Sequence, residues 1–531
     1  MTPPDPPRVR GNDWSVLDAP ALGSYEPRRS VSVVVPAYEA QRTLPYTLAA
    51  LAAQSYPAHL LEAVVVDDGD EPSVELPELR PHRTRVVRPS EGWGAAAARA
   101  AGADAADGEV LHWLDADMVL QRDHLSHHMR WHHASDHVVV LGHKVFVDTE
   151  DLPSVAAVHD AVSADRLDDL LTGRGVDQHD WVDEAWTRTD ELRTAGFRAF
   201  HVHVGATGSV GRALYREAGG MDTTLPFGED VELGYRLAMR GAVFVAERGA
   251  SGWHLGRSHL MQRGEEVQRY YAPFVAQRVP DFRKFRGAAG RTYRVPFLEV
   301  VVDVDGHTWD EVKHTVDGIL AARPADLVCL VVAHWDEPDD RRWRPLRDER
   351  LEERLIREEY AHDSRVSFVD KLPDSAFPAQ FRVHVPVGWR PGPTSLEDVT
   401  RQMQRHAQGL RSLWLPDGQV VRVERTAAFE RAARVRQEGE DRDDAVDAVS
   451  VTHWSSGREA GFTHHTAVED TDPVPSPDPL VPVAPDPAHP DSTGTDPLPT
   501  SRPGVLAGLR RGRRSPRGRG PSAPPVDPEV P

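Results

Sequence analysis

Two aspartates separated by one residue, Asp115 and Asp117, carry the most specific chemistry in the sequence. They follow the apolar run VLHWL, so a buried strand is predicted to end where the two carboxylates begin. Carboxylates in this arrangement can share a divalent cation, and their hard oxygen ligands suit Mg²⁺ or Mn²⁺. Such a cation neutralises a diphosphate leaving group. The same motif is common in surface turns, and its position after an apolar run is what favours metal binding.

A second acidic pair, Glu229 and Asp230, opens the amphipathic helical pattern VELGYRLAM. Acidic side chains at a helix N-terminus complement the helix dipole, which is one explanation of the pair. The other is a general base, because a carboxylate accepts the proton of an attacking hydroxyl at neutral pH. The residues alone leave both explanations open.

Histidines form two further patterns. His254 follows the strand-like run AVFVAERG, where a neutral ring nitrogen could complete a metal shell or pack structurally in a chain with 26 histidines. The run HLSHHMRWHHASDH places His124, His128 and His132 on one face of a helix. No carboxylate–histidine signature accompanies them, which favours an exposed surface helix over a metal site.

Alternating strand and helix patterns position these residues. Val31–Val35 is apolar on both faces, as a central parallel strand requires. A helical segment, the strand-like runs AVVVDDGD and RTRVV, an Ala-rich helix over 95–106 and the strand EVLHWLDAD follow it. The pattern predicts an α/β fold with a mostly parallel sheet flanked by helices. Ligands bind such sheets at the carboxyl ends of the strands, where the acidic residues fall.

Seven segments in chain order resemble the family 2 glycosyltransferases of the GT-A fold. They are VSVVVPAYEA, VVVDDGD, the helix containing Arg99, VLHWLDAD, ATGSVGRALYREAGGMD, PFGEDVELGYRL and WHLGR, and they cover about residues 30–260. The resemblance implies the GT-A fold of nucleotide-diphospho-sugar transferases. It also implies an inverting transfer of a sugar from a nucleotide-sugar, with a UDP-sugar expected, to a glycan or lipid-linked acceptor.

The resemblance also implies roles for individual residues. Pro36, Tyr38 and Glu39 would line the nucleotide pocket, Asp67 or Asp68 would bind the base, Asp115 and Asp117 would hold the ribose and the metal-diphosphate, Asp230 would be the catalytic base, and His254 would be a further metal ligand.

The chain departs from the family pattern at several positions. Tyr38 stands where the family commonly has Asn, and Asp70 where it commonly has Ser. The run EGWGAAAARAAG leaves Arg99 as the only nearby cation for the donor phosphates. The same run fits a dinucleotide-binding fingerprint, but Glu91 would place negative charge beside a pyrophosphate. A second alternative is a non-catalytic nucleotide-sugar-binding or scaffold protein built on a degenerate glycosyltransferase fold.

Composition limits the partners of the chain. Its 531 residues contain 62 Lys and Arg against 83 Asp and Glu, a net charge of −21 that disfavours nucleic-acid binding. The single cysteine excludes a disulfide framework. No secretory signal or membrane-spanning run is recognisable, so we expect a cytoplasmic protein with peripheral contact at the inner membrane face.

Composition also predicts four regions. Residues 1–28 are expected to be a flexible arm, 29–290 the catalytic GT-A domain and 436–531 a disordered acidic, Pro-rich tail. Residues 295–435 repeat the earlier pattern weakly: LEVVVDVDG parallels VSVVVPAYE, but no aspartate pair follows a fourth strand. This region is predicted to be a degenerate, non-catalytic GT-A-like domain, although any two α/β domains share such patterns.

Overall fold

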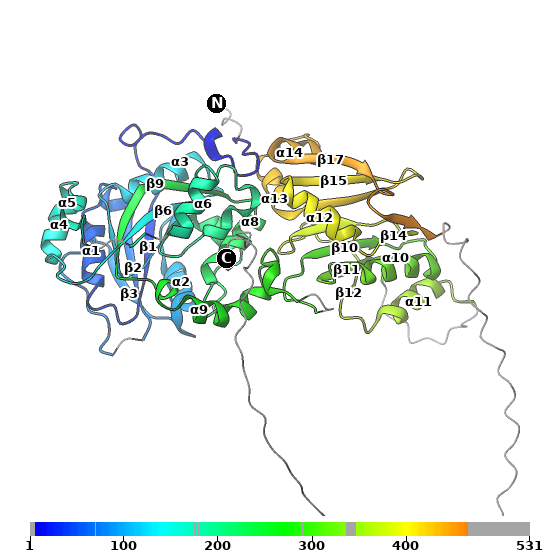
Figure 1. Cartoon of the computed structure of the whole chain (residues 1–531), viewed down its shortest axis with the longest axis horizontal. Coiled ribbons are helices and arrows are strands. Elements are labelled where there is room, and N and C mark those ends of the chain that lie inside the picture. The colour runs from blue at the N-terminus through cyan, green and yellow to red at the C-terminus, as the bar shows by residue number, and fades with distance from the viewer. Residues whose placement is uncertain are drawn as a thin grey trace, which may run out of the picture. The chain divides into compact units, whose positions relative to one another are not determined.

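The computed structural model describes residues 6–69, 71–174, 177–178, 180–287, 291–335 and 347–465. These residues form two large sheets flanked by helices, and both sheets belong to one compact unit (Figure 1). The predicted α/β architecture with a mostly parallel sheet is therefore confirmed.

The first sheet is built around β1, a strand of valines buried on both faces. Its strands run in the order β3 (Thr84–Val87), β2 (Leu61–Asp67), β1 (Val31–Ala37), β4 (Val110–Leu114), β8 (Thr207–Gly211), β6 (Val138–Val147), β9 (Val243–Leu255) and β5 (Met118–Leu120), and β7 (Asp177–Gln178) pairs with β6. The first four are parallel, and β8 is antiparallel to both of its neighbours. β1, β2 and β4 therefore end at one edge of the sheet.

Helices cover this sheet. They are α1 (Leu44–Ala52), α2 (Gly94–Ala105), α3 (His124–Ala134), α4 (Val155–Ser163), α5 (Leu167–Leu171), α6 (Asp180–Arg188), α7 (Arg212–Glu217), α8 (Glu229–Met239) and α9 (His259–Ala276), with short 3-10 turns η1 (Trp14–Val16), η2 (Ala58–Leu60), η3 (Gly196–Val202) and η4 (Arg283–Phe285). The Ala-rich helix predicted over 95–106 is α2. Gly102 lets α2 lie close to the sheet, because a Cβ there would overlap Val34 and lie 3.0 Å from Val66 Cγ2.

The second sheet lies in the C-terminal half of the described chain. Its strands run in the order β12 (Val366–Val369), β11 (Leu327–Val332), β10 (Leu298–Asp303), β13 (Phe381–His384), β16 (Val420–Arg425), β15 (Gln408–Trp414) and β17 (Val451–Ser456). Around it are α10 (Trp309–Ala321), α11 (Leu351–Tyr360), α12 (Ser395–Arg405), α13 (Thr426–Val435), α14 (Arg442–Val449) and the small pair β14 (Trp389–Pro391) and β18 (Phe462–His464).

The second sheet repeats the strand order and pairing directions of the first. The order β12-β11-β10-β13-β16-β15-β17 matches β3-β2-β1-β4-β8-β6-β9, with parallel and antiparallel pairs at the same places. The register agrees as well: Val110 pairs with Gly211, and Phe381 pairs with Arg425. In each sheet the second of these partners immediately precedes a helix, α7 or α13.

A shared core joins the two halves. One apolar cluster contains Leu111 and Val139 of the first sheet together with Phe429 of α13 and Val446 of α14. Arg431 of α13, which is 2% exposed, donates hydrogen bonds to the carbonyls of Gly241 (3.0 Å) and Ala242 (2.6 Å). The second sheet has a core cluster of its own within residues 297–462, but α13 and α14 pack against the first sheet across the predicted boundary between 29–290 and 295–435.

The predictions of a flexible arm over residues 1–28 and of a disordered tail over 436–531 are both wrong in part. Within residues 1–28, Val9 and Leu17 are buried against Trp131 and Val243. Asn12 also donates hydrogen bonds to the carbonyls of Leu192 and Phe244. The arm is therefore packed, because its apolar anchors outweigh its polar composition.

The tail prediction from 436 onward is wrong for residues 436–465. α14, β17 and β18 lie in this segment, and β17 completes the second sheet beside β15. The acidic run that suggested disorder leads into α14: Asp441 caps the helix, and Asp443 and Asp444 lie in its first turn. Residues 466–531 of the predicted tail lie outside the described residues.

Candidate active site

Asp115, Asp117 and His254 come together at the carboxyl end of β4. One ligand atom from each lies within 4.8 Å of the others, and His254 Nε2 is 3.4 Å from Asp117 Oδ1. β4 ends at Leu114 and delivers both aspartates, while β9 delivers His254 through its pairing with Met118 of β5. Residues far apart in the sequence thus form one acidic cluster.

The neutral imidazole and the carboxylate oxygens of this cluster suit a divalent cation. His254 Nδ1 lies 3.1 Å from the carbonyl of Gly256 and donates to it, so the Nε2 lone pair faces Asp117. Burial lowers the pKa of His254 to about 4 and keeps it neutral. Burial and the neighbouring Asp115 raise the pKa of Asp117 to about 7. Asp117 Oδ1 is buried and accepts no hydrogen bond from the described residues, as expected of an oxygen reserved for a metal ion.

Arg99 links this cluster to the second acidic pair. Its guanidinium, 6% exposed, donates to Asp115 Oδ1 at 2.8 Å and to Glu229 Oε1. Burial disfavours its charge, but Glu229, Asp115 and Asp230 outweigh burial and raise the pKa of Arg99. Gly205 leaves room for the guanidinium, since a Cβ there would lie 2.6 Å from Arg99 Cζ.

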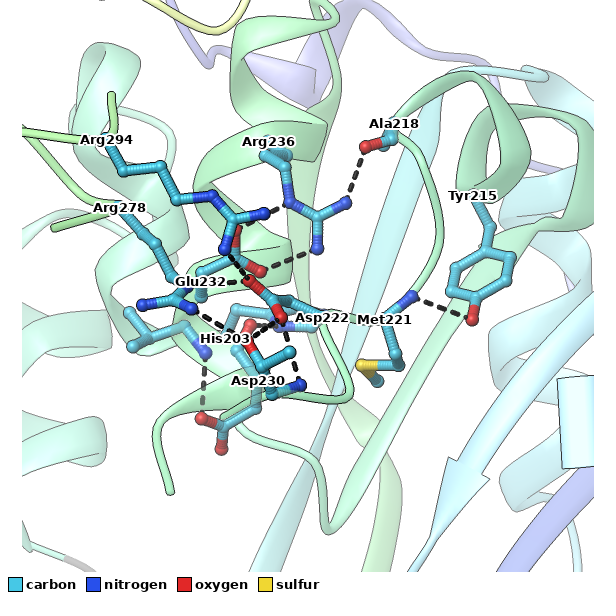
Figure 2. Close-up of polar contacts among 12 residues, drawn as sticks. His203, Tyr215, Ala218, Met221, Asp222, Asp230, Glu232, Arg236, Arg278 and Arg294 are labelled. Atoms are coloured by element: carbon cyan, nitrogen blue, oxygen red, sulfur yellow. Dashed lines mark hydrogen bonds and ion pairs between the residues drawn. The ribbon is translucent and has the colours of Figure 1, made fainter. Parts of the chain in front are cut away.

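Glu229 and Asp230 have different environments at the start of α8. Glu229 is buried against Arg99, and burial and Asp230 raise its pKa to about 7. Asp230 is half-buried, and its carboxylate accepts from the backbone N–H groups of Gly205 (3.2 Å) and Val231 (2.8 Å). His203 donates to the Asp230 carbonyl at 2.7 Å (Figure 2). Glu229 is thus engaged in an ion pair, whereas Asp230 is held by the backbone.

The loop before α8 is anchored by ion pairs. Figure 2 shows Arg278 and Arg294 directed at Asp222, and the nitrogen–oxygen distances are 2.6 and 3.5 Å. One turn into α8, Glu232 binds Arg236, which also donates to the Ala218 carbonyl at 2.5 Å. These contacts hold the loop on both sides of Asp230 and fix the entry of α8.

Lys144 is a site residue that the sequence analysis missed. It lies on β6, and burial lowers its pKa against the opposing influence of Asp115, Asp230 and Asp117. The only indication of Lys144 in the sequence is that lysine is rare: Lys144 is the first of only four lysines in the chain. Its side chain adds a second cation to the acidic cluster, besides Arg99.

The predicted nucleotide-pocket residues lie at the ends of β1 and β2. Pro36 is near the end of β1, and Tyr38 is 62% exposed in the turn that follows. Glu39 adopts a left-handed backbone conformation (φ 51°) in the same turn. β1 and β4 are adjacent and parallel, so this turn and Asp115 leave the same edge of the sheet.

Asp67 and Asp68 both take part in ordering the loops at this edge. Asp67 is buried and accepts from Arg88 Nη2 at 2.8 Å and from two backbone N–H groups. Asp68 accepts from the N–H of Gly94 at 2.7 Å and so joins the end of β2 to the start of α2. The structure therefore brings Asp115, Asp117, His254, Arg99 and Asp230 into one cluster and places the other predicted residues along the same edge of the sheet.

Among the described residues, no helix combines the length and apolar character that crossing a membrane requires.

Comparison with known proteins identifies part of the chain. Residues 32–169 match the family model of glycosyl transferase family 2. A chondroitin synthase of Pasteurella multocida (strain Pm70) is 25% identical over 354 residues, covering 62% of this chain and 36% of that protein. A hyaluronan synthase of Pasteurella multocida is 28% identical over 273 residues, covering 47% and 27%. The chain thus spans about a third of the length of these relatives.

Solved structures with a similar segment include two complexes with nucleotide-sugars. A mannosyltransferase from Pyrobaculum calidifontis in complex with GDP-Man and Mn²⁺ shares 20% identity at a TM-score of 0.30, over 48% of this chain and 63% of that one. S. aureus TarS in complex with UDP-GlcNAc shares 17% identity at a TM-score of 0.33, over 47% and 67%. The similarity to glycosyl transferase family 2 is thus carried by residues 32–169 of this chain.

Proposed function

We propose that the protein is a metal-dependent, inverting glycosyltransferase that moves a sugar from a nucleotide-sugar to a glycan or lipid-linked acceptor. The observation that carries this proposal is the convergence of separate stretches of chain on one cluster. Asp117 faces His254, and Arg99 joins Asp115 to the start of α8, where Asp230 lies. A packing role alone would not require so many ionisable groups at the carboxyl edge of the sheet.

Asp115, Asp117 and His254 would hold the Mg²⁺ or Mn²⁺ ion. The oxygen and imidazole donors fit either ion, and the unpartnered Asp117 Oδ1 supports their use as ligands. When bound, the ion supplies positive charge that neutralises the diphosphate leaving group. Arg99 and Lys144 place fixed positive charge beside the same carboxylates and would assist in binding the donor phosphates.

Asp230 is the proposed general base. Its carboxylate is held by backbone N–H groups and is not committed to an ion pair within 4 Å among the described residues, so it can accept the proton of an acceptor hydroxyl. Glu229 then serves as the anchor that keeps Arg99 in position. Attack by that hydroxyl on the face opposite the leaving group inverts the anomeric centre.

The two Pasteurella relatives support the acceptor class. Both are named as synthases of polysaccharides, which favours a glycan acceptor for this chain. A lipid-linked acceptor would require peripheral contact with a membrane. A UDP-sugar is the expected donor, with Tyr38, Glu39 and either Asp67 or Asp68 at the nucleotide.

The second sheet is proposed to be a non-catalytic counterpart of the first. Val110 begins β4 and Phe381 begins β13, and each pairs with the first residue of the strand beside it, β1 or β10. Counting from these two equivalent positions, Asp115 corresponds to Pro386 and Asp117 to Gly388. These positions offer no carboxylate, so the second sheet cannot repeat the metal cluster. Its strand order supports a common origin of the two halves.

A donor panel tests the proposal. The protein is incubated with Mn²⁺ and UDP-, GDP- or dTDP-sugars, and release of the nucleoside diphosphate is measured. We expect release with one donor class and its loss in Asp117→Asn. The control is Asp123→Asn, an acid 36% exposed at the start of α3, which should keep the activity.

The alternative function is a scaffold that binds nucleotide-sugars without turnover. It predicts donor-induced thermal stabilisation but no diphosphate release under any condition of the panel. If neither release nor stabilisation occurs with any donor, the glycosyltransferase proposal is wrong.

A further inference from the structure

Three buried imidazoles meet between β4, α3 and β8, outside the acidic cluster. His112 belongs to β4, and His124 and His128 lie one turn apart on α3. All three are 0% exposed, and one ring nitrogen from each lies within 4.8 Å of the others. The histidine face of α3, expected to be exposed, is therefore buried, and His112 joins it from a strand.

Hydrogen bonds on the Nδ1 side determine where the ring protons are. His112 Nδ1 lies 2.8 Å from the carbonyl oxygen of Trp113, and His124 Nδ1 lies 2.9 Å from that of Ser251. A carbonyl can only accept, so each Nδ1 must carry a hydrogen. The Nε2 atom of each of these two neutral rings then carries a lone pair and no hydrogen.

These lone pairs face one another. The Nε2 atoms of His112 and His124 are 3.1 Å apart, and Thr207 Oγ1 lies 3.0 Å from the Nε2 of His124 and 3.4 Å from that of His128. Thr207 has one hydroxyl hydrogen and can satisfy only one of these acceptors. A buried group of unsatisfied acceptors is destabilising unless a positive charge lies among them.

All three rings are fully buried, and each is held on its Nδ1 side by a hydrogen bond. A metal cation bound by the Nε2 atoms would supply the positive charge.

The 3.1 Å between the Nε2 atoms of His112 and His124 matches zinc, and a ring nitrogen of His128 lies within 4.8 Å of the other two rings' ligand atoms. Zinc binds imidazole nitrogen at about 2.0–2.1 Å, so two ligands of a tetrahedral site lie about 3.3 Å apart. The contacts on the far side of the rings match as well, because metal-bound histidines usually donate their other N–H to a hydrogen-bond acceptor. His128 Nδ1 completes this pattern with Ser209 Oγ at 2.8 Å.

We propose that the Nε2 atoms of His112, His124 and His128 bind a Zn²⁺ ion, with Thr207 Oγ1 at the fourth position. The ion ties α3 to β4 and β8 behind the strand that ends at Asp115. Because its ligands are fully buried, zinc enters during folding and exchanges slowly afterwards. The site is independent of the proposed glycosyl transfer.

The test measures metal in the full chain, purified without a histidine tag from zinc-supplemented cells and dialysed extensively. The background variant is Asp115→Asn/Asp117→Asn, which removes the carboxylates of the acidic cluster. We expect about one zinc per chain in both proteins by mass spectrometry. His124→Gln and His128→Gln should lose the zinc, whereas His133→Gln should keep it. His133 is the control on the same helix, because its Nδ1 bonds the Met129 carbonyl at 2.7 Å rather than Ser209 Oγ, which supports His128.

A second measurement does not depend on the variants folding. The chain is refolded with Co²⁺ in place of zinc, and the visible spectrum is recorded. We expect the absorption of tetrahedral cobalt without a thiolate band, because the only cysteine, Cys329, is buried in β11. A wild-type chain with no zinc and no tetrahedral cobalt signal overturns the proposal. So does zinc that is lost in Asp115→Asn/Asp117→Asn and kept in His124→Gln, which would assign it to the acidic cluster.

Discussion

Arg99 is the side chain on which the geometry of the acidic cluster most depends. It is buried in an Ala-rich helix and binds carboxylates from β4 and α8 at once. Without it, Glu229 would be a buried charge with no cation within ion-pair distance among the described residues. Removing one partner of a buried pair is far more destabilising than removing an exposed one.

Replacing Arg99 by Met should therefore lower the free energy of unfolding by about 3–5 kcal/mol. Urea denaturation of the purified variant checks this value. The matched control is Arg401→Met, because Arg401 is 52% exposed and its pairs with Glu397 and Asp398 should contribute at most about 1 kcal/mol. Equal losses in the two variants would show that Arg99 is not a structural link.

Asp230→Asn separates catalysis from donor binding. Gly205 and Val231 donate to different oxygens of Asp230, so the variant keeps one of these two hydrogen bonds, and its amide cannot take a proton. We expect the donor dissociation constant to be unchanged and transfer to fall by roughly 10²–10⁴-fold. Calorimetry and a transfer assay measure the two quantities. Loss of donor binding would instead assign Asp230 a structural role.

Most of the residues in the cluster could be predicted from the sequence, because motifs at strand ends reveal them. Asp115 and Asp117 follow an apolar run, and Asp230 opens an amphipathic helix. Lys144 and His112 were not predicted, since each lies inside a strand and its local sequence does not show which distant side chains it faces. Their partners come from distant segments, and only the folded chain brings these together.

At the level of elements, the close approach of α2 to the sheet depends on a glycine, Gly102, which has no side chain. Gly102 packs on Val34 and Val66, where a Cβ would overlap the valines. Gly102→Ala should thus destabilise the protein by about 1–3 kcal/mol, despite the better helix propensity of Ala.

Gly264→Ala is the comparison for this prediction. Gly264 lies in α9, and no atom of the described residues comes within 4 Å of the position that a Cβ would take there. The same change should therefore be neutral or stabilising by up to about 1 kcal/mol. Thermal denaturation distinguishes the two variants. A gain in stability for Gly102→Ala would show that α2 can move away from the sheet.

Glu247 of β9 anchors α3 and gives the fold an acid-sensitive contact. Burial alone would raise its pKa, but the nearby His127 imidazole and the hydrogen bonds from Trp131 and Arg130 outweigh burial and lower the pKa to about 2. A lowered carboxyl pKa stabilises the fold above the ordinary value of 4.5, and this stability is lost as the pH falls from 4.5 towards 2.

Between pH 6 and pH 3 this group should account for about 2 kcal/mol of lost stability. In Glu247→Gln the free energy of unfolding should be lower at pH 6, but its further decline to pH 3 should be smaller by that amount. Urea titrations at the two pH values check the difference. An unchanged decline would mean that other groups control the acid sensitivity.

At the scale of the whole molecule, the two sheets stabilise one another. α13 and α14 contribute to the apolar cluster of the first sheet, and Arg431 donates to the two carbonyls just before β9. The described residues should consequently unfold in one cooperative transition.

Arg431→Met tests this coupling. The substitution leaves the carbonyls of Gly241 and Ala242 without their buried donor, at a cost on the order of 3 kcal/mol. Calorimetry should show one transition in the wild type, shifted to lower temperature in the variant. Arg436→Met, on the exposed end of α13, should leave the transition unchanged. Two separate transitions in the wild type would contradict the coupling.

The sequence by itself determined the class of fold, the first four strands with the helices between them, and the acidic motifs at the ends of elements, because these depend on local periodicity and on the residues at the termini of elements. Tertiary structure alone decided which side chains meet: that His112 joins α3, that Arg99 bridges two acidic motifs, and that residues 6–28 and 436–465 are packed. Contacts between distant segments depend on how whole elements pack, and no local pattern encodes that packing.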